Sequence, residues 1–198
     1  MKYLGPTITI HGGGEDLLFP HHEAEITQME SVSGKKPLVN YWMHTGFLTI
    51  NDQKMAKSLG NFITIHELLR EYSKEAFRLF VLSSHYKSPI DYQENALEQA
   101  KANAKRLGEF YIRLRNSPRS SYHKGGQGGV TDAFFAELED DFNTPKALAV
   151  LFEIVREANT LLDKKKLSQE NANSFLKFLD EINSIFGIIP EVKAEQIP

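Results

Sequence analysis

Apolar side chains in the second half of the chain recur at alternating intervals of three and four residues. Three runs have this spacing: Leu97, Ala100, Ala104, Leu107, Tyr111 and Leu114; Leu148, Leu151, Val155, Ala158 and Leu162; and Ala172, Phe175, Leu179, Ile182 and Phe186. The spacing places each run on one face of an α-helix, and a shorter segment, 131–142, repeats it with Phe134, Leu138 and Phe142. Each apolar stripe is too narrow for a helix buried on all sides, so we expect an antiparallel helical bundle.

Polar residues near the ends of these segments predict where the helices begin and end. Thr144 is the candidate N-cap of a helix with Pro145 at its first position, and Gly187 predicts a helix end. Thr64 and Glu67 have the spacing of a capping box, in which each side chain accepts a hydrogen bond from the other residue's backbone amide. We therefore expect helices from about residue 61 to about residue 190, with a Gly/Ser-rich linker over 116–130.

The first sixty residues have the pattern of a mixed α/β structure. A β-branched run over 7–10 ends at the glycine triplet 12–14, a helix-compatible segment covers 20–31, and another strand is expected over 46–50. Strand, helix and strand with glycines at the strand ends are typical of the latter portion of a parallel-sheet nucleotide-binding domain. The predicted fold class is thus an α/β fragment of Rossmann type over 1–60, a mostly helical region over 61–90 and a helical bundle over 91–190.

Composition and charge narrow the function classes. The net charge of −3 gives no global attraction to nucleic acid, so such binding would depend on local basic patches. No run of about 18 apolar residues is present, which predicts no membrane span, and we expect a cytoplasmic protein. The chain has no cysteine, so it forms no disulfide and supplies no thiolate ligand.

The stretch FPHHEAEI contains two histidines and two glutamates, a composition found in metal sites. His21 and Glu25 are four residues apart and would lie on one face of a helix, as two ligands of a zinc ion could. The alternative is that these histidines cap the helix or face solvent. A tetrahedral zinc ion needs more than two ligands, and the only other histidine close in sequence is His11.

Two further segments could bind a nucleotide. The glycine triplet allows close approach of the backbone to a ligand, and Asp16 just beyond it could bind ribose hydroxyls. Lys54 and Lys57 in the segment KMAKS could neutralise charge on a polyphosphate during phosphoryl or adenylyl transfer. The alternatives are that the glycine triplet forms a plain turn between strand and helix, and that the two lysines lie on a solvated surface hairpin.

A basic stretch lies between residues 101 and 124. It carries seven basic side chains against one acid, Glu109: Lys101, Lys105, Arg106, Arg113, Arg115, Arg119 and Lys124. The excess of positive charge suits a phosphate backbone, and the alternative is the charged outer half of a solvated helix.

The order of these segments resembles cysteinyl-tRNA synthetase, a class I aminoacyl-tRNA synthetase. The resemblance rests on GGGEDLLFPHHEAEI, YWMHTGFLTIN, KMAKSLGNFITI and DDFNTPKALAVLFE, and it covers roughly residues 8–188. It implies ATP-dependent activation of L-cysteine to cysteinyl-adenylate and transfer of the cysteinyl group to tRNA(Cys) in translation. It also implies a Rossmann-like catalytic domain, a stem-contact region and an anticodon-binding bundle, matching the three segments above.

By this resemblance His21 and Glu25 match two zinc ligands, and the family's other two ligands are cysteines upstream of this chain. Borderline-soft zinc would bind the substrate thiolate in preference to the hydroxyl of serine.

The resemblance also implies nucleotide-binding residues. Lys54 and Lys57 match the two lysines of the KMSKS loop that act on ATP, which is expected with Mg²⁺. Further expected ATP-binding residues are Gly14 and Asp16 near the adenylate and Gly46 and Phe47 at the adenine pocket.

The chain departs from the family pattern at three points. Ala56 replaces the serine of KMSKS, the HIGH motif is absent with the N-terminal half of the catalytic domain, and the C-terminal tail is short or missing. We therefore expect the isolated chain to form no cysteinyl-adenylate. Two alternatives are a tRNA-binding module without catalysis, which would bind through Arg113 and Arg115, and the related ligase that joins cysteine to an amino-sugar in mycothiol synthesis.

Overall fold

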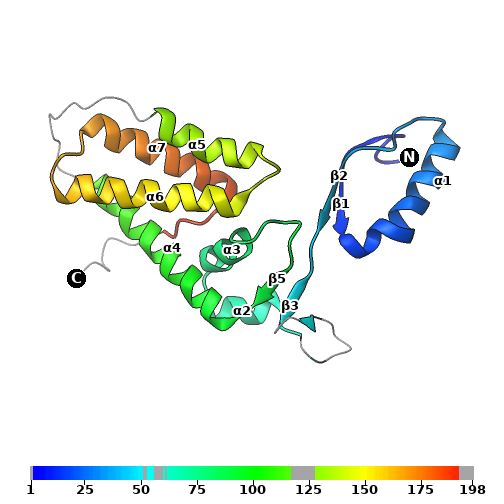
Figure 1. Cartoon of the computed structure of the whole chain (residues 1–198), viewed down its shortest axis with the longest axis horizontal. Helices are drawn as coiled ribbons and strands as arrows, with labels where there is room; N and C mark the ends of the chain where they lie inside the picture. Colours follow the sequence, from blue (N-terminus) through cyan, green and yellow to red (C-terminus); the bar gives the residue numbers. More distant parts are fainter. Residues whose placement is uncertain (1, 51–52, 56–59, 61, 117–127, 192–198) are drawn as a thin grey trace. The chain divides into compact units, whose positions relative to one another are not determined.

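The computed structural model describes residues 2–50, 53–55, 60, 62–116 and 128–191 (Figure 1). It divides into two compact units. The first contains Met1–Phe62 and Tyr86–Tyr92, and the second contains Ile63–His85 and Gln93–Pro198. None of the helices in the described ranges has both the length and the apolar character needed to cross a membrane.

The first unit is built on a strand–helix–strand crossover. β1 (Ile8–Gly14) pairs in parallel with β2 (Val39–Thr45), and the connection contains η1 (Glu15–Leu17), η2 (Leu18–His22) and α1 (Glu23–Ser33). A parallel pair needs a long crossover of this kind. We expect helical structure from residue 20, and within η2 only Phe19, just before it, has extended backbone angles; the regular α1 begins at Glu23. Gly34 ends α1 in the left-handed conformation.

A second, smaller sheet in this unit has the strand order β4–β3–β5. β3 (Leu48–Ile50) pairs antiparallel with β4 (Gln53–Lys54) and parallel with β5 (Ile90–Tyr92). The strand expected over 46–50 is therefore shorter at its start. Gly46 lies outside it, where a Cβ atom would come within 2.5 Å of the Ser88 backbone. A side chain at position 46 would prevent that approach.

The second unit is helical. Its elements are α2 (Ile65–Glu71), α3 (Lys74–Leu82), α4 (Glu94–Arg115), α5 (Gly128–Glu139), α6 (Thr144–Asp163) and α7 (Gln169–Phe186). The Thr64–Glu67 capping box is present in full at the start of α2. At the start of α6 the N-cap is Asn143, whose side chain accepts from the Lys146 amide, so the prediction of Thr144 as the cap is off by one residue.

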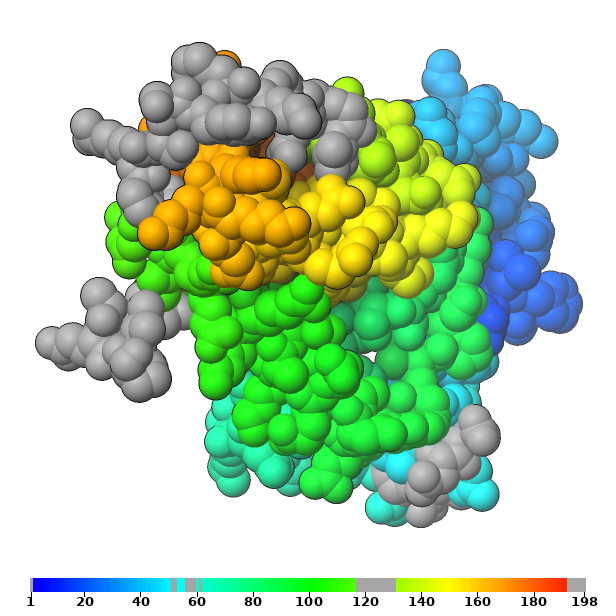
Figure 2. Space-filling model, turned by 60° about the vertical axis from the view of Figure 1, so that its left-hand side comes forward, coloured from blue at the N-terminus to red at the C-terminus, as the bar shows by residue number. Residues whose placement is uncertain are grey.

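The apolar stripes of the bundle form its core. α3 packs on α4, α5 on α6 and α4 on α7, and Figure 2 shows α4 directly beside α6 on the visible face. The most deeply buried large side chains are Leu97, Leu107, Phe110, Leu114, Phe134, Leu151, Val155, Leu179, Ile182 and Ile188. The expected stripe of α5 is wrong at Phe142, which is exposed in the turn between α5 and α6 with a positive φ.

Candidate metal and nucleotide site

Imidazole and indole rings gather at the crossover of the first unit. Trp42 on β2 is the register partner of His11 on β1, and the two ring centres are 4.8 Å apart. His44 follows Trp42 by two positions, so both side chains lie on one face of β2, where their rings stack. Nδ1 of His22, at the end of η2, lies 2.8 Å from Nε2 of His44. Five aromatic rings, including that of His21, therefore line one region between β1, β2 and α1.

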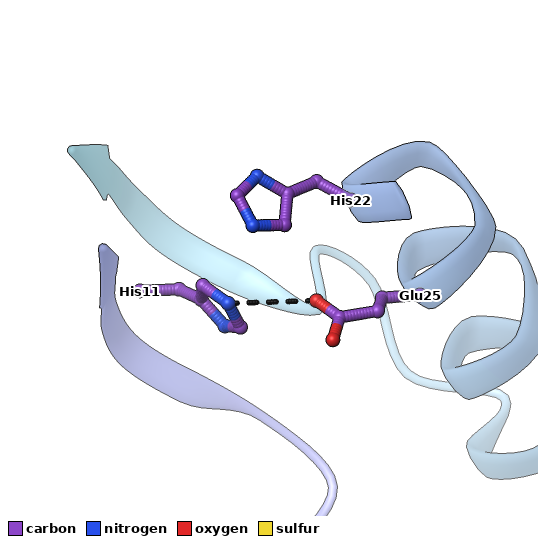
Figure 3. A group of neighbouring side chains, drawn as sticks. All are labelled: His11, His22 and Glu25. Carbon is purple, nitrogen blue, oxygen red and sulfur yellow. Dashed lines mark ion pairs between the residues drawn. The ribbon is translucent and has the colours of Figure 1, made fainter. Parts of the chain in front are cut away.

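Glu25 on the first turn of α1 faces two of these histidines. Its Oε1 lies 3.4 Å from Nε2 of His21, and its Oε2 lies 3.4 Å from Nε2 of His11 (Figure 3). Oε2 is buried and accepts no hydrogen bond from the described residues. A buried oxygen without such a donor is costly in a folded protein, and a cation would satisfy it.

The His22 ring is almost fully buried, with 2% of its surface exposed. Burial lowers the pKa of His22, and the neighbouring His11 and His44 imidazoles lower it further. The ring is therefore neutral at pH 7, the form in which imidazole binds a metal ion.

The structure brings together some of the nucleotide-binding residues expected from sequence. Nζ of Lys54 lies 3.3 Å from Oδ2 of Asp16 and 3.7 Å from the centre of the Phe47 ring. A Cβ on Gly14 would lie 2.6 Å from Oδ1 of Asp16, so the glycine leaves room for that carboxylate. Lys57 and Ala56 lie outside the described residues, and Gly46 lies against the 88–89 backbone.

The two arginines expected to bind tRNA have different surroundings. Arg113 donates to Oδ1 of Asp163 at 2.6 Å and also to Asn159, so it joins α4 to α6. Arg115 is exposed and lines a pocket of about 260 Å³ between α4, α7 and the segment after α7. Tyr111 in this pocket donates to Asp180 at 2.7 Å, and this bond is the main reason that its pKa is raised.

The sequence pattern predicts that His21 lies beside Glu25, but it does not predict that His11, Trp42 and His44 belong to the same cluster. The signal for them was present, since a parallel crossover aligns β1 with β2 and the pair Trp42 and His44 has strand spacing. The strand over 39–45 itself was not predicted, and without it the cross-strand partner of His11 could not be inferred.

The class of the chain follows from its sequence profile and fold. The profile described as the catalytic domain of class I (C) tRNA synthetases matches residues 1–102, and the DALR domain profile matches residues 133–190. The chain belongs to this class I tRNA synthetase family, and the fold class predicted from sequence is confirmed.

The similar curated proteins are named as cysteine–tRNA ligases, which confirms the predicted family. That of Geobacillus sp. strain WCH70 is 42% identical over 195 residues, covering 94% of this chain and 42% of the relative. That of Alkalilimnicola ehrlichii is 54% identical over 160 residues, covering 81% and 34% respectively. The chain thus spans less than half the length of these relatives.

Two solved structures share the fold at 18% sequence identity. The LeuRS of Agrobacterium radiobacter K84, in a ternary complex with tRNA and LeuAMS, matches 90% of this chain and 26% of its own with a TM-score of 0.68. The Mycobacterium tuberculosis methionyl-tRNA synthetase with methionyl-adenylate matches 86% of this chain and 37% of its own with a TM-score of 0.62. At 18% identity, this similarity shows a shared fold and nothing about function.

Proposed function

We propose that this chain is the zinc-binding and helical portion of a cysteine–tRNA ligase, which activates L-cysteine with ATP and transfers it to tRNA(Cys). The observation that supports this most directly is the pair of His21 and Glu25, whose ligand atoms face each other at 3.4 Å in a chain of this family. An imidazole and a carboxylate so placed fit a zinc ion, and the second oxygen of the same carboxylate is buried and accepts no hydrogen bond from the described residues.

His21 and Glu25 would hold the zinc ion together with two ligands from outside this chain, since the chain has no cysteine. A zinc ion bound there supplies a borderline-soft partner for sulfur, which distinguishes cysteine from serine. His11 touches the second oxygen of Glu25 and so limits rotation of the carboxylate. The rings of Trp42, His22 and His44 pack against one another beside this pair.

Lys54 would bind the phosphates of ATP, with Mg²⁺ as the usual companion of the nucleotide. Its present partner is the carboxylate of Asp16, an exposed pair that contributes little stability and can be exchanged for phosphate oxygens. Placed there, the ammonium group would neutralise negative charge that develops as pyrophosphate leaves. Lys57 is proposed to act beside it.

The first unit also has an open apolar face. Ile10 and Tyr41 are register partners on β1 and β2, and they are 59% and 67% exposed. We propose that a further part of the catalytic domain covers this face in the active enzyme and that this chain alone forms no cysteinyl-adenylate.

ATP–pyrophosphate exchange tests this proposal. The purified chain should show no cysteine-dependent exchange, and addition of a polypeptide carrying the upstream catalytic segment of a relative should restore it. Exchange should then disappear with His21→Ala or Glu25→Ala and should not be supported by serine. Cysteine-dependent exchange by the chain alone, or restored exchange that does not depend on His21, would contradict the proposal.

A second candidate is a tRNA-binding module, favoured by the DALR profile over residues 133–190 and the exposed Arg115. This function predicts salt-sensitive binding of tRNA by the chain that survives Lys54→Ala. Absence of binding at low salt would exclude it.

A further inference from the structure

The turn between α5 and α6, within the segment DDFNTP, has an unusual backbone. Asp141 and Phe142 both have a φ of +54°, the left-handed conformation that residues other than glycine rarely adopt. Two successive residues keep this conformation only when contacts around the turn hold it. One of these contacts comes from the residues that follow α3.

His85, shortly after the end of α3, binds the turn. Its Nε2 lies 3.0 Å from the carbonyl oxygen of Asp141, and because that oxygen can only accept, Nε2 carries the hydrogen and donates it. Oγ1 of Thr144 lies 3.5 Å from the Ser84 carbonyl oxygen, a longer and weaker contact between the same two segments. From this geometry we propose that the hydrogen bond between His85 and Asp141 is a clasp that positions β5 and, through β3, the strand that carries Lys54.

The chain passes from the clasp directly into the strands of the first unit. Tyr86 follows His85 and begins the stretch 86–92 that belongs to that unit. The Tyr86 carbonyl oxygen accepts a hydrogen bond from the Gly46 amide at 2.9 Å. Gly46 also lies so close to the Ser88 backbone that no Cβ atom would fit there. A displacement of His85 would therefore act on a tightly packed backbone segment that begins at the next residue.

Hydrogen bonds continue from this stretch to the strand of Lys54. The Ile90 amide donates to the Phe47 carbonyl at 2.8 Å, where β5 begins beside β3. On β3, Thr49 is the register partner of Asp91 on β5 and of Lys54 on β4. The Thr49 hydroxyl also donates to Oδ1 of Asp91 at 2.8 Å. β3 is thus held between the strand that follows the clasp and the strand that carries the lysine.

In this proposal His85 is a positioning residue that acts on Lys54 through β5 and β3. The consequence for ATP binding rests on the proposed function of Lys54, whereas the effect on the strands does not. The alternative is that His85 merely stabilises the helical unit. In that case its loss would affect the amides of α6 at least as strongly as those of Gly46 and Ile90.

Amide hydrogen exchange of the intact chain, followed by NMR, separates these two roles, because it reports local opening residue by residue. In His85→Ala, the amides of Gly46 and Ile90 should exchange about tenfold faster or more, since the bonds that they donate lie next to the clasp. The amide of the buried Leu151 on α6 should change by less than about twofold.

Substitutions that keep or move the donor test the hydrogen bond itself. His85→Gln places an amide donor near the position of Nε2 and should preserve slow exchange, whereas the shorter His85→Asn should resemble His85→Ala. The comparison of the Gln and Asn variants gives the same test if the Ala variant does not fold. Asp141→Gly keeps the carbonyl and suits the positive φ, so exchange at Gly46 should stay slow. The matched control is His66→Ala, which removes a histidine of the same unit that contacts Arg70 on its own helix and should have no effect.

The Lys54 side chain provides a second readout. Its Nζ lies 3.7 Å from the centre of the Phe47 ring, so the ring current shifts the neighbouring methylene resonances. This shift should shrink in His85→Ala and persist in His85→Gln.

Three results would each overturn the proposal: unchanged exchange at Gly46 and Ile90 in His85→Ala, equal acceleration at Leu151, or identical behaviour of the Gln and Ala variants. An unchanged Lys54 shift in His85→Ala would count against it in the same way. Neither measurement uses ATP or tRNA, so failure of the clasp is distinguishable from failure of the ligase function, which pyrophosphate exchange tests.

Discussion

The ring of His22 occupies the space that a side chain at Gly13 would need. A Cβ atom on Gly13 would lie 2.7 Å from Cε1 of His22, closer than such atoms approach in proteins, and 3.0 Å from its Nε2. The middle glycine of the triplet thus permits a buried imidazole to pack on the β1 backbone. This role concerns the histidine cluster, whereas the sequence suggested approach to a nucleotide.

Gly13→Ala should therefore displace His22. We expect a loss of about 1–3 kcal/mol in the free energy of unfolding, the usual cost of an added methyl group in a packed site. Urea unfolding measures this effect. Gly12→Ala is the matched control, because its Cβ would meet only the Met43 carbonyl at 3.7 Å. An equal loss of stability in the two variants would contradict the conclusion that His22 packs against Gly13.

A side chain at position 187 is expected to destabilise the second unit. It ends α7 with a φ of +58°, and a Cβ there would collide with the guanidinium of Arg78, which donates to the Phe186 carbonyl at 3.2 Å. Gly187→Ala should cost about 1–2 kcal/mol from the left-handed conformation, plus a smaller collision part, because the Arg78 guanidinium is the end of a flexible side chain and can move. In a double-mutant cycle with Arg78→Ala, the collision part should vanish. Strictly additive costs would contradict this explanation.

The sequence predicted those features that depend on local spacing. The stripes through Leu97 and Leu107 are buried as expected, and the spacing of His21 and Glu25 does place their ligand atoms face to face. Phe142 followed the same rule and is exposed, because the backbone leaves the helix with positive φ at Asp141 and Phe142. Helical spacing cannot show where a helix ends in such a turn.

The rest of the site depends on contacts between residues distant in the chain. His11 meets Trp42 through the register of two parallel strands, and β5 reaches β3 from about forty residues away. The short strands carry too few residues to show an alternating pattern of their own. These pairings arise from tertiary packing, which no single segment encodes.

Stability at alkaline pH should depend on Tyr72. Burial is the main cause that raises the pKa of Tyr72 to about 12, with a hydrogen bond to Glu98 as the next. An unfolded tyrosine loses its proton near pH 10, so between about pH 10 and pH 12 the unfolded state binds fewer protons and stability falls as pH rises. Tyr72→Phe should flatten the decline in this window, as measured by urea unfolding at several pH values. An unchanged slope would contradict this.

Arg113 and Arg115 are expected to differ, although sequence reasoning grouped them as tRNA-binding residues. Arg113 is engaged by Asp163 and Asn159, so Arg113→Ala should lower the free energy of unfolding by up to about 1 kcal/mol, the range for partly exposed ion pairs. Arg115 is exposed, and in the described part of the chain no ion pair to it is found.

If the bundle binds tRNA as proposed, Arg115→Ala should weaken tRNA binding. It should also reduce the slope of the logarithm of the association constant against the logarithm of salt concentration by about one. The free energy of unfolding should not change. Filter binding across a salt series, paired with urea unfolding of both variants, separates the two roles. Arg113→Ala serves as the control of equal charge change on the same helix. A reduced salt slope for Arg113→Ala with none for Arg115→Ala would reverse the assignment, because it would mean that the Asp163 pair opens to release Arg113 to the phosphate backbone.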